Sequence, residues 1–321
     1  MNEHILNLLT QTVLEQLWPL PSEAKELVLN KLLLLKRTDL GNLFKNEILR
    51  SMRISRRLFL TRFMTILSGV VFIDVLFERF SIKFKEYHLN SNPEITHLKA
   101  IQISDLHLKK LRFHHDAMCK QIENSHPDLL LLTGDLIDDA KNLPELESFL
   151  KLLPLATPKF AVLGNWEYWA GIAISELQCL YAKYGCKLLI NSQESVVLKG
   201  RKITITGIDD FVAGKADIKK ATENFSKSDY HLVLNHCPQY SEQISFEVDE
   251  KIPVDLILSG HTHGGQINFF GFVPFLPQGS GRFVGGWYTV GKHNLYVSKG
   301  IGTSILPIRF GARAEIAIFN F

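Results

Sequence analysis

The chain has 321 residues, 46% of them hydrophobic, and a formal net charge of +3. This length suits one catalytic domain of about 230 residues with an additional segment, and the apolar content is sufficient for a sizeable core. There is no internal repeat or low-complexity tract, which excludes a repeat architecture. The four cysteines form no CxxC pair and no dense framework, so neither a structural zinc site nor a disulfide scaffold is expected, and a reducing compartment is favoured.

Two helices are predicted near the N-terminus, over residues 4–17 and 23–36, separated by the prolines of WPLPSE. The second contains LVLNKLLLL, which is apolar around much of its circumference and must therefore be buried against something. The excess positive charge of the chain lies in a stretch that overlaps the end of the second helix. Residues 31–62 carry nine Lys and Arg against two acidic residues, a net +7 that leaves −4 for the rest.

Residues 58–77 are apolar enough to indicate a membrane interaction. Arg62 and Asp74 interrupt this segment and leave an unbroken apolar stretch of eleven residues, whereas a spanning helix needs about 18. An apolar segment preceded by clustered Lys and Arg is suited to peripheral binding at an anionic lipid surface. A helical hairpin packed on the catalytic domain is the alternative.

The motif SRRLFLTR, at residues 55–62, resembles a twin-arginine export signal. Fifty-four residues precede it, and no A-x-A-like cleavage site closes the apolar run, so export is kept as a minority alternative. The main expectation is a helical, basic, membrane-associating segment over residues 1–90.

From residue 96 onward, short apolar strands alternate with amphipathic stretches. Strands are predicted over residues 97–104, 128–133, 159–164, 231–236 and 255–260. Helices are predicted near 112–125, 144–152 and 173–184, and residues 196–207 predict a hairpin that turns at Gly200. Strands separated by helices indicate an α/β core, with ligands expected where the strands end.

Residue types that bind metals lie at the ends of all five strands. The motifs are, in chain order, DLH, GD, GN, NH and GHTH. Their seven candidate ligands are Asp105, His107, Asp135, Asn165, His236, His261 and His263. Each motif alone is weak, because a lone DxH is usually a surface feature, but the ordered set at five strand ends indicates one metal centre.

The spacing and chemistry of these residues support a shared centre. A one-residue gap in DxH and HxH directs both side chains to the same side of an extended strand end. Gly134, Gly164 and Gly260 allow the backbone to turn sharply beside a bulky centre. Carboxylate, imidazole and amide oxygen together favour borderline or hard divalent ions such as Mn²⁺, Fe²⁺ or Zn²⁺ over a thiolate site.

These motifs resemble the calcineurin-like metallophosphoesterase superfamily over residues 96–321. The resemblance implies a four-layered αββα sandwich, a site for two divalent ions, expected to be Mn²⁺, and attack by a metal-bridging hydroxide. It assigns ligands of the first metal, a bridging carboxylate and ligands of the second metal, which are respectively Asp105, His107 and His263; Asp135; and Asn165, His236 and His261.

Two longer motifs, GHTHGGQI at 260–267 and YVSKGIGTSILPIRFGARAEI at 296–316, are similar to a membrane-associated bacterial branch of that superfamily. The branch includes twin-arginine-exported phosphodiesterases and chlamydial-type UDP-2,3-diacylglucosamine pyrophosphatases of lipid A synthesis. The resemblance implies a UDP-sugar lipid as substrate and a peripheral position at the cytoplasmic face of a bacterial inner membrane.

Trp166 occupies a position at which many members of the superfamily have a histidine that protonates the leaving oxygen. An indole N–H cannot serve as an acid. Because the seven ligand candidates are all present, the substitution favours a substrate with a good leaving group, such as a pyrophosphate, over an inactive enzyme. Glu167 is expected to orient a ligand. Trp166 is a candidate substrate contact, whereas core packing is an equal alternative for Trp169.

Residues 267–288 hold five Phe, a Trp and a Tyr among Gly and Pro, too irregular for a strand or a helix. Packing over a core and a lid or membrane-dipping loop beside the metals are equal alternatives. Arg309 in LPIRF is the second candidate substrate contact, because a guanidinium can bind phosphate oxygens bidentately.

The leading hypothesis is therefore a two-metal hydrolase that cleaves UDP-2,3-diacylglucosamine to UMP and 2,3-diacylglucosamine 1-phosphate. One alternative is a broad-specificity or exported phosphodiesterase acting on nucleotides or phospholipids. Another is a catalytically silent metal-binding adaptor at the membrane. Nucleic acid is not expected as a partner, because the basic cluster lies outside the catalytic domain and lacks interleaved aromatic residues.

Overall fold

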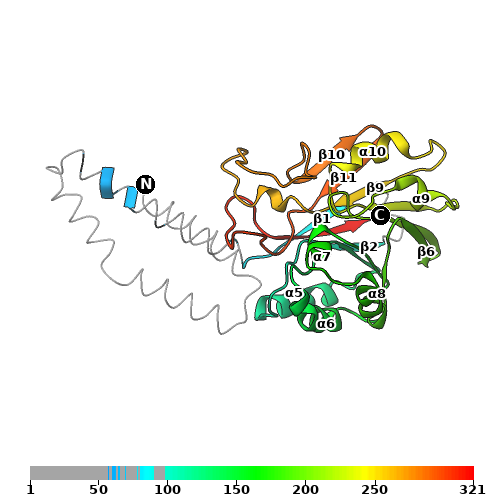
Figure 1. The fold of residues 1–321 in the computed structure, drawn as a ribbon, viewed down its shortest axis with the longest axis horizontal. Coiled ribbons are helices and arrows are strands. Elements are labelled where there is room, and N and C mark those ends of the chain that lie inside the picture. The colour runs from blue at the N-terminus through cyan, green and yellow to red at the C-terminus, as the bar shows by residue number, and fades with distance from the viewer. Residues whose placement is uncertain are drawn as a thin grey trace. The chain divides into compact units, whose positions relative to one another are not determined.

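A computed structural model of the chain describes residues 57, 60–62, 64, 65, 69, 78, 80–89 and 98–321 (Figure 1). The chain divides into two compact units, Met1–Asp74 and Val75–Phe321. The helices expected over 4–17 and 23–36 lie outside the described residues. Within 58–77, the described residues between 60 and 69 are helical. In the part of the chain that is described, no helix combines the length and the apolar character required to cross a membrane.

The described part of the second unit is built around two six-stranded sheets. In spatial order, the first consists of β1 (Lys83–His88), β12 (Glu315–Asn320), β2 (Lys99–Ile103), β3 (Leu129–Thr133), β4 (Lys159–Val162) and β5 (Cys186–Leu188). The second consists of β10 (Gly286–Val290), β11 (His293–Val297), β9 (Leu256–Ser259), β8 (Tyr230–Leu234), β7 (Arg201–Gly207) and β6 (Ser192–Leu198). Both sheets are mixed, because β12 pairs antiparallel with β2, and β10 and β6 pair antiparallel with their neighbours.

Helices cover the outer face of each sheet (Figure 1). The first sheet packs against α5 (Phe113–Asn124), α6 (Leu143–Leu152) and α8 (Ile174–Lys183). The second sheet packs against α9 (Ile218–Thr222) and α10 (Tyr240–Glu247). A separate core lies between the two sheets, where side chains of β2, β3 and β4 meet those of β7, β8 and β9. The order of layers is helix, sheet, sheet, helix.

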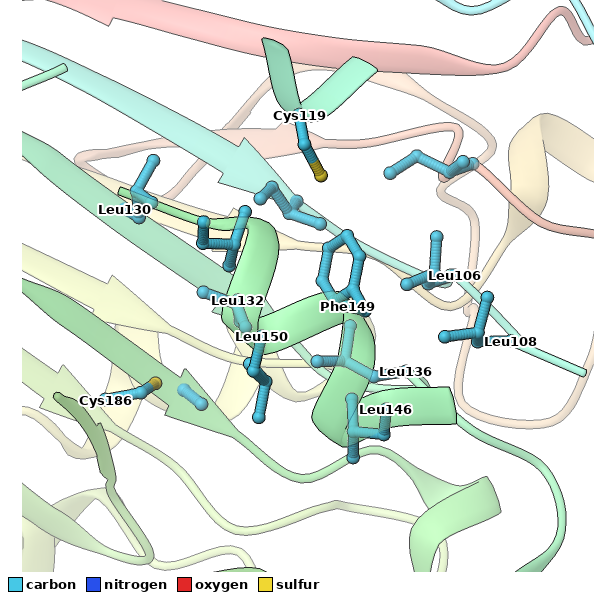
Figure 2. Packing of buried hydrophobic residues seen from close by; sticks show 14 of the residues in the cluster. Leu106, Leu108, Cys119, Leu130, Leu132, Leu136, Leu146, Phe149, Leu150 and Cys186 are labelled. Atoms are coloured by element: carbon cyan, nitrogen blue, oxygen red, sulfur yellow. The ribbon is translucent and has the colours of Figure 1, made fainter. Parts of the chain in front are cut away.

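The run of leucines in β3 shows why this architecture follows from the sequence. Successive strand residues point to opposite faces. Leu130 and Leu132 accordingly pack with Phe149 of α6 in the helix-facing core, which Figure 2 shows from close by. Leu129 and Leu131 join the core between the sheets. A strand buried on both faces needs apolar residues at every position, which is typical of a parallel strand covered on both sides.

The five predicted strands and three predicted helices of the catalytic region are confirmed, within a few residues at each end. The predicted hairpin is also confirmed. β6 and β7 pair antiparallel, and Lys199 and Gly200 between them have φ values of 48° and 79°. Positive φ at both turn residues matches the twist of the two strands.

Two expectations about local structure are wrong. Residues 83–88 lie within the range assigned to a helical N-terminal segment, yet they form β1, which pairs in parallel with β12. Residues 286–288, expected in an irregular loop, begin β10. Both strands are half exposed, and β1 obtains its hydrogen bonds from the far end of the chain. Local periodicity therefore carries little signal for either strand.

Candidate metal centre

The seven candidate ligands come together where strands of both sheets end. Asp105 and His107 follow β2, Asp135 follows β3, and Asn165 begins α7 (Asn165–Trp169) after β4. The second sheet contributes the three remaining histidines, His236 after β8, and His261 and His263 after β9. Each of the seven side chains is exposed by 5% or less. Parallel neighbours present their carboxyl ends at one edge, which is why residues far apart in sequence meet there.

The first group of ligand atoms is formed by Asp105, His107 and His263, whose ligand atoms lie within 4.8 Å of one another. The Nε2 atoms of His107 and His263 are 3.0 Å apart, and His263 Nε2 is 3.7 Å from Asp105 Oδ1. Asp135 Oδ2 lies 3.8 Å from His107 Nε2 and 3.1 Å from His236 Nε2. Asp135 is thus situated between the two groups, at the position expected of a bridging carboxylate.

The second group is formed by His236 and His261, and Asn165 lines the same pocket as His261. His261 Nδ1 is 3.2 Å from His236 Nε2. Nδ1 of His236 donates to the Thr133 carbonyl at 2.7 Å, which leaves Nε2 as the acceptor atom. Nε2 of His261 donates to the Gln278 carbonyl at 2.7 Å, which leaves Nδ1. Backbone carbonyls therefore direct one lone pair of each ring toward the same place.

The electrostatics of the cluster leave Asp135, His261 and His263 in the protonation states that bind cations. Burial lowers the pKa of His261 to about 4, and that of His263 well below its ordinary value, with nearby His107 and Arg309 contributing. Burial opposes ionisation of Asp135, but the attraction of His236 outweighs it and holds the pKa of this carboxyl below its usual range. The same attraction raises the pKa of His236 well above its ordinary value, so His236 must release a proton when a metal binds, whereas His261 and His263 are neutral donors beside the ionised carboxylate.

Asn165 offers an independent test of the fit to a metal. Its amide oxygen is buried and has no hydrogen-bond partner. An unpaired buried carbonyl is costly, and a cation that the amide oxygen could coordinate would remove this cost. Together with two carboxylates and four imidazoles, this oxygen forms a donor set that fits two divalent cations.

Cys237 lies within reach of His236 and His261 but does not share their role. Its thiol donates to Asp210 Oδ2 at 3.1 Å, and burial raises its pKa well above the ordinary value. A buried thiol that remains protonated is neither a thiolate ligand nor a nucleophile.

Most of the cluster depends on backbone conformations that are rare for residues with side chains. The φ value is positive at five of the seven candidate ligands, namely Asp105 (50°), His107 (44°), Asp135 (54°), His261 (73°) and His263 (52°). Such conformations cost about 1 to 3 kcal/mol each and persist only where the surrounding structure imposes them. The strand ends thus carry local strain that serves to direct the ligands inward.

The three glycines expected to allow sharp turns serve chiefly to leave space. Only Gly134 has a positive φ, of 86°. A Cβ atom on Gly164 would lie 2.2 Å from Asp135 Oδ1, and one on Gly260 would lie 2.3 Å from Asp105 Oδ2. Both distances are too short for any side chain, so these positions must be glycine for the two carboxylates to occupy their places.

The expectation that Glu167 orients a metal ligand is confirmed by its contacts around Asp135. Glu167 is 1% exposed, and its carboxylate accepts hydrogen bonds from the backbone N–H groups of Asp135, Leu136 and Gly164, at 3.0, 2.6 and 2.9 Å. These bonds hold the backbone on both sides of the Asp135 side chain. Thr133 and Gln278, which orient two histidines, were not identified from the sequence, because they act through backbone carbonyls that any residue type could supply.

A pocket of about 480 Å³ opens directly beside the ligands. Its polar wall includes Asp135, Asn165, His261 and His263, and its apolar wall is formed by Trp166, Trp169, Val212, Ile267, Pro274, Phe275, Pro277, Ile305 and Leu306. Trp166 donates its backbone N–H to Asp135 Oδ1 at 2.9 Å while its ring lines the pocket. Trp169 is 58% exposed, so core packing is the wrong alternative for this residue.

Arg309 is not situated where a substrate contact would require. Its side chain is fully buried, and it is absent from the pocket wall. Its guanidinium donates to the carbonyls of Gly302 and Ala312, at 3.0 Å from Nε and 2.7 Å from Nη1, and lies 3.3 Å from His263 Nδ1. The expected phosphate contact is therefore corrected: Arg309 supports the backbone behind His263.

Comparison with known proteins agrees with this geometry. Residues 98–265 match the calcineurin-like phosphoesterase family. The chain is 31% identical over 229 residues to the uncharacterized metallophosphoesterase YkuE of Bacillus subtilis, covering 69% of this chain and 78% of that protein. It is 32% identical over 230 residues to the phosphodiesterase YaeI of Escherichia coli, covering 69% and 81% respectively.

Among solved structures, a 5′-nucleotidase precursor from Thermus thermophilus matches with a TM-score of 0.43 and 13% identity over 64% of this chain. The chain spans about half of that structure's length, 49%. This structural similarity is too low to support a family assignment, which rests on the family match and on the relatives.

The chain belongs to the calcineurin-like phosphoesterase family. It is a metal-dependent phosphoesterase hydrolase with a buried site of histidine and aspartate residues. The alternative of a catalytically silent adaptor is therefore set aside.

Proposed function

We propose that this hydrolase cleaves the pyrophosphate bond of UDP-2,3-diacylglucosamine, releasing UMP and 2,3-diacylglucosamine 1-phosphate. The observation that carries the proposal is the pocket, in which one wall consists of metal-ligand candidates and the other of apolar side chains. A substrate matched to such a site has a phosphate group at one end and an extended apolar portion at the other. A UDP-linked diacyl sugar has both.

The second support is the lack of a proton donor. Besides the ligand candidates, none of the described residues that line the pocket has a side chain able to protonate a leaving oxygen near neutral pH. Trp166 occupies the position where an acid would be expected. A leaving phosphate needs no protonation, whereas an alkoxide does. The site is accordingly better suited to an anhydride than to an ester of a basic alcohol.

Different residues of the chain have different roles in such a reaction. Two divalent cations, when bound, supply an activated water and neutralise charge on the phosphoryl oxygens; Mn²⁺ is the ion we propose. Asp135 lies between the two ligand groups and holds their spacing. The carbonyls of Thr133 and Gln278 fix the ring orientation of His236 and His261. The apolar wall offers a surface for the acyl chains of the substrate.

The location that fits this reaction is the cytoplasmic face of a bacterial inner membrane, with the chain bound peripherally. The support is the sequence of the N-terminal unit, in which net charge of +7 over residues 31–62 overlaps the apolar segment 58–77. Clustered cations beside an apolar segment favour an anionic lipid surface, because each cation near the surface contributes about 1 kcal/mol.

The test is a product assay on the purified full chain with Mn²⁺ and UDP-2,3-diacylglucosamine. We expect UMP and the acylated sugar phosphate in equal amounts, with no product after chelation of the metal. Bis-p-nitrophenyl phosphate, assayed in parallel, reports whether the metal centre is active at all. Active hydrolysis of that ester without release of UMP from the lipid would overturn the proposed substrate.

A phosphodiesterase of broader specificity is the second candidate. The observation that favours it is the similarity to the phosphodiesterase YaeI, at 32% identity. This candidate predicts that bis-p-nitrophenyl phosphate and phospholipid diesters are cleaved at rates comparable to, or higher than, that of the UDP-linked lipid. The same assay therefore separates the two.

A further inference from the structure

Exposed apolar side chains lie at the mouth of the pocket and on the chain turn at 269–272 that leads to it. We call them the apolar rim, which consists of Trp169, Phe269, Phe270, Phe272, Phe275, Ile305 and Leu306. Phe270 is fully exposed, and Ile305 is 78% exposed. Contiguous exposed apolar patches on soluble domains usually mark an interaction site. Three separate parts of the chain contribute to this one, at residues 169, 269–275 and 305–306, so the rim is a product of the fold.

The tip of the rim is built to present its aromatic side chains to the outside. Phe269 and Phe272 exchange backbone hydrogen bonds of 2.9 and 3.0 Å across a tight turn. Phe270 in that turn has a φ of 52°, which is unfavourable for a bulky residue. The base of the turn is anchored, because the Phe269 ring lies 5.0 Å from that of Phe310. Phe283, later in the same loop, is instead fully buried.

The two alternatives for residues 267–288, packing over the core and an outward-facing loop, apply to different parts of this segment. The later part packs over the core at Phe283, whereas the earlier part keeps its aromatic residues outside. Contact with water does not stabilise a strained turn that exposes phenylalanine. Such a turn is stabilised only when an apolar partner covers the side chain.

The position and charge of the rim indicate which partner this is. Residues 266–281 contain no Asp, Glu, Lys or Arg, and the only charged residue of 300–310 is the buried Arg309. Trp169, Phe275, Ile305 and Leu306 also line the pocket. A protein bound to the rim would close the pocket to substrate. A bilayer would cover the same surface and leave the pocket open to lipids.

Glu78, the first described residue of the second unit, lies close to the rim. The backbone N–H of Ala312 donates to Glu78 Oε2 at 3.3 Å, and Arg313 Nε donates to the Ser81 carbonyl at 3.1 Å. Ala312 is two residues from Phe310, on which the rim residue Phe269 packs. The apolar segment 58–77 directly precedes Glu78 in the sequence.

We propose that the apolar rim inserts into the interfacial layer of a bilayer and that lipid substrates enter the pocket from there. The identity of the substrate rests on the proposed function, whereas insertion of the rim does not. The rim would be a second membrane contact, made by the catalytic domain itself and close to the point where the chain enters it.

Insertion can be measured without any substrate by tryptophan quenching. Phe270→Trp is prepared in the full chain, with Phe246→Trp as the matched control, because Phe246 on α10 is 88% exposed and lies outside the rim. Both proteins are mixed with phosphatidylglycerol-containing vesicles that carry brominated acyl chains. We expect the added tryptophan of Phe270→Trp to be quenched at least roughly twice as strongly as that of the control.

Two results of this experiment would overturn the proposal. One is equal quenching in the two variants. The other is a blue-shifted emission of Phe270→Trp before vesicles are added, which would show that a protein segment covers the rim. Neither result depends on which phosphate compound the enzyme cleaves, so failure here is distinguishable from failure of the proposed substrate.

A functional test uses two rim residues that do not line the pocket. The double variant Phe270→Ser and Phe272→Ser should cleave soluble bis-p-nitrophenyl phosphate at the wild-type rate. Its turnover of UDP-2,3-diacylglucosamine in vesicles should fall by roughly ten-fold, since two phenylalanines no longer enter the bilayer. Phe246→Ser should leave both rates unchanged. Unchanged vesicle turnover in the double variant would contradict the role of the rim.

Discussion

The ligand cluster and the apolar rim lie on adjacent parts of one pocket, yet they are built in opposite ways. The seven ligand candidates are exposed by 5% or less, and five of them have a positive φ. The rim residues, by contrast, are each exposed by 49% or more. The difference follows from what each contacts: metal coordination requires atoms fixed within tenths of an ångström, whereas apolar chains require only surface. Substitutions in the cluster should therefore be far more damaging than those in the rim.

The largest effect is expected at the centre of the cluster. Asp135→Ala removes the carboxylate that lies between the two ligand groups. We expect kcat on bis-p-nitrophenyl phosphate to fall by at least about a thousand-fold, equivalent to about 4 kcal/mol. Calorimetric titration with Mn²⁺ should show weakened binding at the same time. Activity within ten-fold of wild type would show that Asp135 does not bridge metals.

A single methyl group should test how closely the cluster is packed. In Gly260→Ala the new Cβ would lie 2.0 Å from Ser104 Oγ and 2.3 Å from Asp105 Oδ2, so Asp105 must move. Displacing a ligand by about 1 Å costs roughly a hundred-fold in rate, and overpacking costs about 1 to 3 kcal/mol of unfolding free energy. Activity and denaturant titration measure the two effects.

Gly200→Ala is the matched control for that variant. Gly200 has a φ of 79°, but a Cβ there would meet nothing within 4 Å. The cost should be about 1 kcal/mol of stability from backbone strain alone, with no change in activity. Equal loss of activity in both variants would mean that the effect at Gly260 is not local to the site.

Glu167→Gln tests the support behind the cluster. The carboxylate of Glu167 accepts three backbone N–H groups around Asp135 and Gly164. An amide group cannot accept all three, because its nitrogen is a donor. We expect Mn²⁺ affinity to fall by roughly ten- to a hundred-fold, as is usual for residues that orient metal ligands, with partial rescue of activity by excess Mn²⁺. Lost activity with unchanged metal affinity would argue for a different role.

The smallest effect is expected at the rim. Phe275 is 69% exposed and lines the pocket mouth. Phe275→Ser should raise KM for the acylated substrate by about three- to ten-fold and leave its stability and its hydrolysis of bis-p-nitrophenyl phosphate nearly unchanged. An effect on the soluble ester as large as on the lipid would remove the distinction between cluster and rim.

The extent to which sequence predicts structure differs between the ligand cluster and β1 for a physical reason. Asp105, His107 and Asp135 directly follow strands whose apolar runs are visible locally, so their meeting at one sheet edge could be predicted. Glu167 could be found because it adjoins a ligand motif. Residues 83–88 could not be recognised as a strand, since their hydrogen-bond partner is β12, over 200 residues later.

The sequence by itself determined the α/β class, the positions along the chain of the strands that carry the ligands, and the ligand candidates, because these depend on local periodicity and short motifs. Only the tertiary structure decided that Arg309 faces backbone carbonyls and His263 instead of the pocket, and that Gln278 orients His261. It also decided that Phe275, Ile305 and Leu306, from distant parts of the chain, are exposed side chains of one pocket wall. These features arise from contacts between distant segments, which leave no pattern in the chain near either partner.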